Sequence, residues 1–83
     1  MPRYFFDVHD GASIPDEVGE ELSSLREARV RAVALSGALL RDEAAQFWSG
    51  EDWRMEVRDE TGLILFTLSF MATDAPTLRN ASG

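Results

Sequence analysis

The chain has 83 residues, no cysteine and a formal net charge of −7, from 15 acidic against 8 basic residues. This length allows one domain with a core that is only just sufficient, so association with a further chain would help to stabilise it. The lack of cysteine excludes disulfides, thiolate nucleophiles and cysteine-based zinc sites, and it favours a cytoplasmic location. No segment approaches the roughly 20 apolar residues of a membrane span, and the acidic excess disfavours nucleic acid and anionic lipid as partners.

The first part of the chain predicts a strand, a tight turn and an acidic loop. Residues 2–9 alternate between an apolar row and a mixed row, which is typical of a strand with one core-facing side. The apolar row is Tyr4, Phe6 and Val8. Asp10 and Gly11 are a strong turn signal, so residues 12–16 are expected to fold back as a short second strand. We expect residues 16–22 to form an irregular loop.

A helix is predicted from Ser24 to about Gln46 or Trp48. Ser24 and Glu27 have the spacing of a capping box, in which side chains and backbone amides at a helix start satisfy one another. Small and apolar residues recur at helical spacing on one stripe and its flank. The stripe contains Leu25, Ala28, Ala32, Leu35, Ser36 and Leu39, and the flank contains Val33, Leu40 and Phe47. Gly50 is expected to end the helix or to lie in the next turn.

The stretch from residue 53 to residue 70 predicts a β-hairpin with one apolar face on each strand. A four-residue loop over residues 59–62 keeps both apolar rows on one side. This register places Val57 opposite Ile64 and Met55 opposite Phe66. Gly62 is expected to supply a positive φ, and the Asp59 carboxylate is expected to bond the turn backbone.

Together these elements predict an α+β fold in two layers, with one long helix packed on a three- or four-stranded antiparallel sheet in the order β-β-α-β-β. The simplest strand order places the short second strand beside the first, followed by the third and the fourth. Residues 1–71 are expected to form a single domain, and residues 72–83 a flexible C-terminal tail.

Three stretches carry a resemblance to a known family: MPRYFFDVHDG, then PDEVGEEL leading into LREARVRAVA, and finally WRMEVRDETGLILFTLSF. Together they resemble a family of short proteins from rhizobium-like alphaproteobacteria, a domain of unknown function. This resemblance implies a fold and a bacterial host but no catalytic residues. The chain is also similar to HicB-type antitoxins, although it lacks the additional strand and the separate DNA-binding segment that those proteins often have.

The best candidate site is the sheet face that the helix does not cover, because apolar residues occur there where alternation predicts solvent. The predicted partner-binding residues are Phe5, Arg54, Arg58, Leu63 and Leu65. Aromatic, aliphatic and arginine side chains are enriched at binding interfaces. The leading hypothesis is therefore a non-enzymatic module that uses this face or an edge strand to bind itself, as a homodimer, or another protein. The alternative interpretation is that charged side chains simply cover scattered apolar ones.

Two other functions are compatible with the sequence. Arg3, Arg54 and Arg58 on the same face could serve an antitoxin-like or RNA-binding regulator. A cation-binding or minor enzymatic role is conceivable at Asp7, His9 and Asp10, but the spacing matches no EF-hand and there is no second histidine. No catalytic residue, metal ligand or cofactor is predicted.

Overall fold

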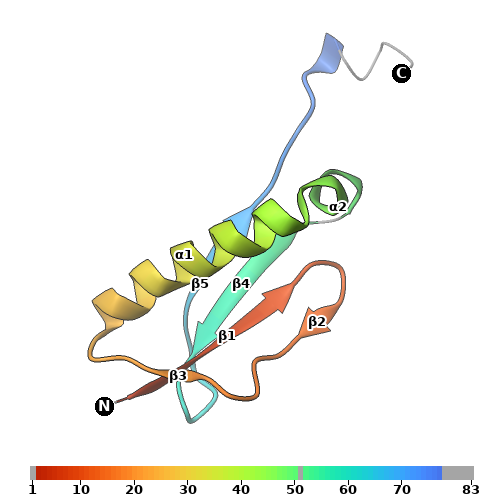
Figure 1. Cartoon of the computed structure of the whole chain (residues 1–83). Coiled ribbons are helices and arrows are strands. Elements are labelled where there is room, and N and C mark those ends of the chain that lie inside the picture. Colours follow the sequence, from red (N-terminus) through yellow and green to blue (C-terminus); the bar gives the residue numbers. More distant parts are fainter. Residues whose placement is uncertain (1, 51, 78–83) are drawn as a thin grey trace.

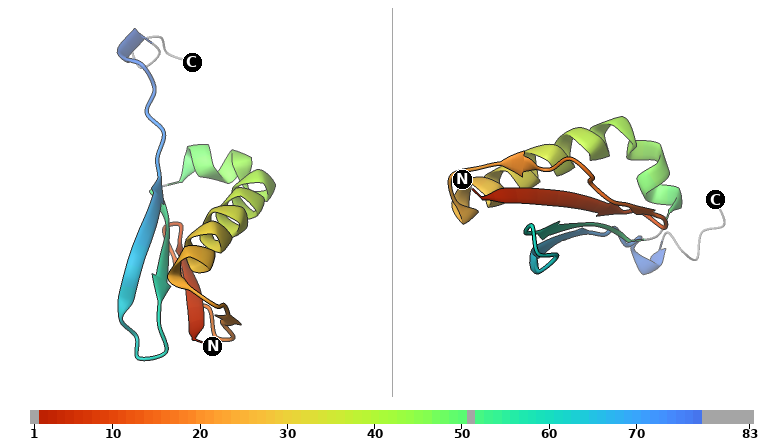
Figure 2. Two further views of the ribbon diagram at one scale, coloured as in Figure 1. Left: turned by 90° about the vertical axis from the view of Figure 1, so that its left-hand side faces the viewer. Right: turned by 90° about the horizontal axis from the view of Figure 1, so that it is seen from below.

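The computed structural model describes residues 2–50 and 52–77. Its strands are β1 (Arg3–His9), β2 (Ser13–Ile14), β3 (Glu20–Glu21), β4 (Trp53–Arg58) and β5 (Ile64–Phe70), and its helices are α1 (Leu25–Asp42) and α2 (Ala44–Ser49). The helices lie on one side of an antiparallel sheet (Figures 1 and 2). The predicted α+β class with two layers is confirmed.

The sheet has the order β2-β1-β4-β5, and β3 pairs with the other end of β1. Every strand pair is antiparallel. The four predicted strands correspond to β1, β2, β4 and β5 and lie in the expected order, but β3 is additional, so the prediction of three or four strands is wrong and the sheet has five. The acidic connector was expected to be irregular, and instead it returns to β1 at Glu20 and Glu21, opposite Tyr4 and Arg3.

The helix begins as predicted and ends earlier. Ser24 is the N-cap of α1, and its side chain accepts a hydrogen bond from the Glu27 amide. The prediction of one helix to about Gln46 or Trp48 is wrong, because Glu43 leaves helical geometry at φ −116° and ψ 28° and separates α1 from α2. Figure 1 shows α2 turned away from the axis of α1, and Phe47 on α2 packs against the core.

The core lies between α1 and the central strands. Its buried apolar members are Tyr4, Phe6, Val8, Ala28, Ala32, Trp53, Met55 and Val57. Ala28, Ala32 and Ser36 are fully buried, because small side chains let the helix axis approach the sheet closely. The Ser36 hydroxyl lies 3.6 Å from the Met55 sulfur, so it has a polar partner inside the core.

The hairpin has the predicted core-facing residues from Phe66 to Phe70, but its register differs, and Ile64, which was predicted on the core side, lies opposite Arg58 on the open face. Val57 lies opposite Phe66 and Met55 opposite Leu68, and the pairing shifts between Val57 and Arg58. The predicted pairing is therefore wrong by two residues. The loop spans residues 59–63, because the Asp59 carboxylate accepts hydrogen bonds from the amides of Thr61 and Leu63. The positive φ expected at Gly62 is confirmed, at +91°.

After β5 the chain continues away from the sheet (Figure 1). Residues 72–77 are exposed, and the rest of the predicted tail, residues 78–83, lies outside the described residues. Neither helix of the described chain has both the length and the apolar composition needed to cross a membrane.

Candidate interaction surface

The five predicted partner-binding residues lie on or beside the open sheet face, but the fold uses them unequally. Arg54 and Leu63 are exposed, whereas Phe5, Arg58 and Leu65 are half-buried. Leu63 lies in the hairpin loop beyond the last sheet pair, so it is beside the face. The structure therefore does not bring the five residues together as one free surface.

Arg58 is held in place by partners from β1 and from the loop after β2. Its Nε donates to Asp7 Oδ2 at 2.7 Å, and its Nη2 donates to the Asp16 carbonyl at 2.9 Å. The guanidinium carbon lies 4.5 Å from the centre of the Phe5 ring, a cation–π contact. Asp7 is only 8% exposed, so its charge needs this partner. Arg58 and Phe5 are therefore engaged in contacts within the fold, and they are not free to bind a partner in this arrangement.

The Asp16 carboxylate covers the gap along β1 between β2 and β3. Its Oδ2 accepts from the Phe6 amide at 3.1 Å, and its Oδ1 accepts from the amides of Val18 and Gly19 at 3.0 Å. Burial raises the pKa of this carboxyl. The three amide hydrogen bonds and the nearby Arg58 charge outweigh that effect and hold the pKa below its ordinary value of 3.8. The Asp16 carboxylate therefore orders the loop, a role that the sequence analysis did not assign to it. The spacing Asp16-x-x-Gly19 could have indicated this role, because Asp side chains commonly bond the backbone of such turns.

Gly19 carries a prediction about this loop, because it has a φ of +74° and packs on Phe5. A Cβ at this position would lie 2.8 Å from Phe5 Cε2, whereas a Cβ at Gly11, with φ of +102°, would meet nothing within 4 Å. We expect Gly19→Ala to lower the free energy of unfolding by about 2 kcal/mol, and Gly11→Ala by about 1 kcal/mol, because only the former adds a clash to the backbone strain. Urea unfolding of both variants measures the difference, and equal losses would contradict close packing at Gly19.

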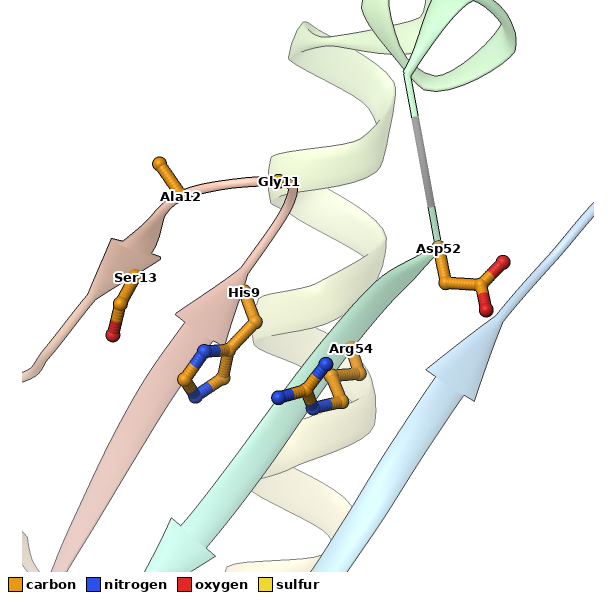
Figure 3. A pocket seen from close by; sticks show the side chains of 6 residues that line it. All are labelled: His9, Gly11, Ala12, Ser13, Asp52 and Arg54. Atoms are coloured by element: carbon orange, nitrogen blue, oxygen red, sulfur yellow. The ribbon is translucent and has the colours of Figure 1, made fainter.

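A polar hollow of about 590 Å³ lies at the other end of the open face and is lined by His9, Gly11, Ala12, Ser13, Asp52 and Arg54 (Figure 3). The Arg54 side chain extends toward His9 there, while Asp52 points away from both. Glu56 lies near both, with Oε1 2.9 Å from His9 Nε2 and Oε2 3.3 Å from Arg54 Nε. The His9 contact is one of proximity, since Nε2 has no hydrogen-bond partner of acceptable geometry. Glu56 therefore offsets the positive charge that the hollow would offer to an anion.

The residues of the conceivable cation site do not converge. Asp7 pairs with Arg58, and His9 lies against Glu56. Asp10 is in the turn after β1, where its carboxylate accepts from the Ala12 amide at 3.4 Å. Within residues 2–50 and 52–77, no three His, Asp or Glu side chains are grouped so as to hold a metal ion.

The outer edge of β5 is the largest unpaired part of the described sheet, and the residue pattern alone did not single it out. In this sheet β5 has a neighbour only on its β4 side, whereas the edge of β1 is covered by β2, β3 and Asp16. The seven residues ILFTLSF include no charged residue and no proline, the two devices that commonly protect an edge strand. Its core-side residues Phe66, Leu68 and Phe70 are only half-buried.

The backbone groups that face this edge follow from the pairing. The Phe6 amide points away from β4 because it donates to Asp16. Phe6 lies opposite Val57, so the Val57 backbone is directed to β5, where it pairs with Phe66. Thr67 and Ser69 alternate with Phe66, Leu68 and Phe70 in the regular part of this pairing, so their N–H and C=O groups are directed toward the free edge. The register shift between Phe66 and Ile64 interrupts this alternation at Leu65.

An apolar hollow of about 240 Å³ adjoins the C-terminal end of β5. It is lined by Leu40, Ala44, Phe47, Trp48, Phe70 and Met71. Trp48 is 65% exposed and Met71 is 71% exposed. At the opposite end of β5, Leu63 and Ile64 are also exposed, at 61% and 51%. Both ends of this edge therefore present uncovered apolar surface.

A comparison with family models gives one finding and the other comparisons give none. Neither a curated protein nor a solved structure matches the chain. The family model described as "Domain of unknown function (DUF6894)" matches residues 3–71. The expected membership in a family of unknown function is thereby confirmed, while the expected host and the similarity to HicB-type antitoxins stay predictions. The match runs from the first strand through the whole of β5, which is most of the sequence, and the chain therefore belongs to the DUF6894 family.

Proposed function

We propose that this chain is a non-enzymatic protein-interaction module that forms homo-oligomers through the free edge of β5. The observation that carries the proposal is a seven-residue strand without charge or proline whose outer backbone groups have no partner in the described sheet. An added strand would satisfy these groups and cover the apolar row beside them. The small core gives such association a second benefit, because burial at an interface adds to what one short chain can bury alone.

The charges on the open face favour protein over nucleic acid as the partner. Arg3 lies 3.3 Å from Glu21, Arg54 lies 3.3 Å from Glu56, and Arg58 lies 2.7 Å from Asp7. Each arginine of the RNA-binding alternative thus has a carboxylate beside it, which reduces its attraction for phosphate. The lack of cysteine supports a cytoplasmic setting for the proposed module.

Replacing Thr67 with proline tests the proposal. The Thr67 amide faces the free edge, so Thr67→Pro removes a donor that an added strand needs and leaves the pairing with β4 intact. We expect light scattering to give a mass near twice 9.2 kDa for the wild type and near 9.2 kDa for the variant. Thr67→Ala is the matched control, because it keeps the amide and should remain associated.

Circular dichroism checks that the variants are folded, and Ser69→Pro provides a second variant with the same expectation if Thr67→Pro does not fold. A wild-type protein that is monomeric at every concentration would contradict homo-oligomerisation. A folded Thr67→Pro or Ser69→Pro variant that remains a dimer would contradict the use of the β5 edge.

A further inference from the structure

The side of α1 that is turned away from the sheet carries apolar residues where a solvent-facing helix normally carries charged ones. No other described element covers this side of the helix (Figure 2). Between Arg31 and Arg41 the helix contains no charged residue. Five exposed residues form what we call the outer face of α1: Val30, Val33, Ala34, Gly37 and Ala38. Val30 is 62% exposed and Val33 is 58% exposed, so this apolar face is not covered within the described chain.

The shape of the outer face suits the side chains of another helix. Ala34, Gly37 and Ala38 have small side chains, which let a second helix approach closely. A Cβ at Gly37 would meet nothing within 4 Å, so no contact inside the chain requires glycine there, although glycine is unfavourable in a helix interior. A mainly apolar hollow of about 380 Å³ adjoins the face and is lined by Leu22, Arg26, Glu27, Val30, Arg31 and Ala34. Large side chains at helical spacing can enter it.

The charge around the outer face is positive, although the chain as a whole is acidic. The helix α1 contains four arginines and two carboxylates, whereas the net charge of the chain is −7. One carboxylate, on Glu27, accepts a hydrogen bond from the Ser23 hydroxyl at 2.7 Å, and the other lies at the far end beside Arg41. Arg26 and Arg29 form no ion pair within the described residues. A partner that complements this surface is therefore negatively charged.

We infer that the outer face of α1 binds an acidic amphipathic helix of another protein. Arg26 and Arg41 are separated by about 22 Å along the helix axis, at about 1.5 Å per residue. A partner helix of about four turns would place a row of large aliphatic side chains over Val30 and Val33. Its Asp and Glu residues would lie beside the arginines at both ends. This surface belongs to the helix layer and not to the β5 edge, so the inference does not depend on homo-oligomerisation through β5.

Two other occupants fit the outer face less well. A second copy packed through its own α1 would bring the arginines of the two helices together, and like charges across an interface are unfavourable. An anionic membrane would attract the arginines, but the face has no Trp, Phe or Leu side chain to enter the lipid surface. The net charge of −7 also repels such a membrane.

Designed peptides test the chemistry of the partner. The first is a fluorescein-labelled helix of about 16 residues, with leucines along one side and glutamates at both ends. The second has lysine in place of each glutamate, and the third is a scrambled form of the first that loses the leucine row. We expect fluorescence anisotropy to show saturable binding of the glutamate peptide, at least about ten-fold tighter than that of the other two.

Substitutions on the outer face test where the peptide binds. Val30→Glu puts a carboxylate at the contact and should weaken binding of the glutamate peptide by at least about ten-fold. Val18→Glu is the matched control, because Val18 is 75% exposed and lies in the loop before β3. Gly37→Gln is a second variant with the same expected loss, since a larger side chain there would hold the partner helix away. Circular dichroism checks that each variant is folded.

Several results would overturn the inference. These are the absence of saturable binding of the glutamate peptide, equal binding of the lysine or scrambled peptide, and equal affinity of the wild type and Val30→Glu. Sedimentation with phosphatidylserine vesicles that is lost in Val30→Glu, without peptide binding, would assign the face to a membrane instead.

Light scattering separates this inference from the proposed function. Val30→Glu should have the same oligomeric mass as the wild type, and a lower mass would assign the outer face to a second copy and overturn the inference. A wild-type monomer that binds the glutamate peptide through α1 would overturn only the proposal for β5.

Discussion

Replacing Arg58 with alanine is expected to lower the free energy of unfolding by about 2–3 kcal/mol. Asp7 lies beside the guanidinium at 2.7 Å and is 8% exposed, so the substitution leaves a buried carboxylate with one remaining hydrogen-bond donor, the Asp16 amide at 2.8 Å. The Asp16 carbonyl also loses its 2.9 Å bond from Arg58. Loss of the stacking contact with Phe5 adds to the effect.

Arg54 gives a matched control, because it lies on the same strand and the same face and is exposed. Its contact with Glu56 at 3.3 Å is a surface ion pair, so Arg54→Ala should cost less than about 0.5 kcal/mol. Arg58→Met keeps a long apolar side chain over Phe5 and should still lose most of the stability if the charge on Asp7 is the cause. Urea unfolding followed by tryptophan fluorescence at one fixed protein concentration measures all three. Equal losses for Arg54→Ala and Arg58→Ala would contradict a structural role for Arg58.

Alternation in the sequence was sufficient to predict the strand faces except at Ile64, and it was insufficient to predict the hairpin register. Val57 and Phe66 both face the core, as expected, because a shift of two residues preserves the faces of a regular strand. The bulge beyond Val57 then places Ile64 on the face of Arg58. The register instead depends on the loop, where the Asp59 carboxylate bonds the Leu63 amide and extends the turn. Residues 59–62 look like a sufficient loop because a bulge after Val57 is not visible in an apolar pattern.

The sequence pattern also could not show which of the predicted partner-binding residues are free to contact a partner. Phe5 and Arg58 do share the open face, but the loop after β2 packs on Phe5 and accepts a hydrogen bond from Arg58. The free edge of β5 depends on strand order and on what covers the other edge, which are properties of the whole sheet. Likewise, no glycine or proline at Asp42 indicates from the sequence that α1 ends there. The bend after Asp42 accompanies the packing of Phe47 on the core.

Asp16→Ala is expected to lower the free energy of unfolding by about 2–3 kcal/mol, because three backbone amides lose one acceptor group. The Phe6 amide is the most sensitive of the three, since it lies in β1 between the parts covered by β2 and β3. Without the carboxylate this stretch of β1 has no bonded neighbour on that side, and the loop that covers Phe5 loses its anchor. Urea unfolding at neutral pH measures the loss.

An asparagine at position 16 tests the contributions of the two carboxylate oxygens separately. The Phe6 amide uses Oδ2 and the amides of Val18 and Gly19 use Oδ1, whereas an asparagine side chain has a single acceptor oxygen. Asp16→Asn should therefore keep one side of the contact and lose roughly half as much stability as Asp16→Ala. Asp10→Ala is the control, because Asp10 accepts a single exposed hydrogen bond at 3.4 Å. A loss at Asp10 as large as that at Asp16 would show that general charge effects, not the loop anchor, determine the result.

The same carboxylate should make the stability of the protein depend on pH in the acid range. The pKa of Asp16 in the folded chain is below its ordinary value of 3.8, so the unfolded chain binds the proton more tightly. The stabilisation is therefore fully present above the unfolded pKa and is lost as the pH falls through the folded pKa. We expect the difference in unfolding free energy between wild type and Asp16→Ala to be constant above about pH 5 and to shrink below about pH 4. Glu27 and Asp59, whose pKa values are also lowered, by hydrogen bonds from Ser23 and Thr61, add to the acid sensitivity of both proteins and cancel in the difference. A difference that stays unchanged down to about pH 2 would show that the ionised Asp16 carboxylate is not what holds the loop on β1.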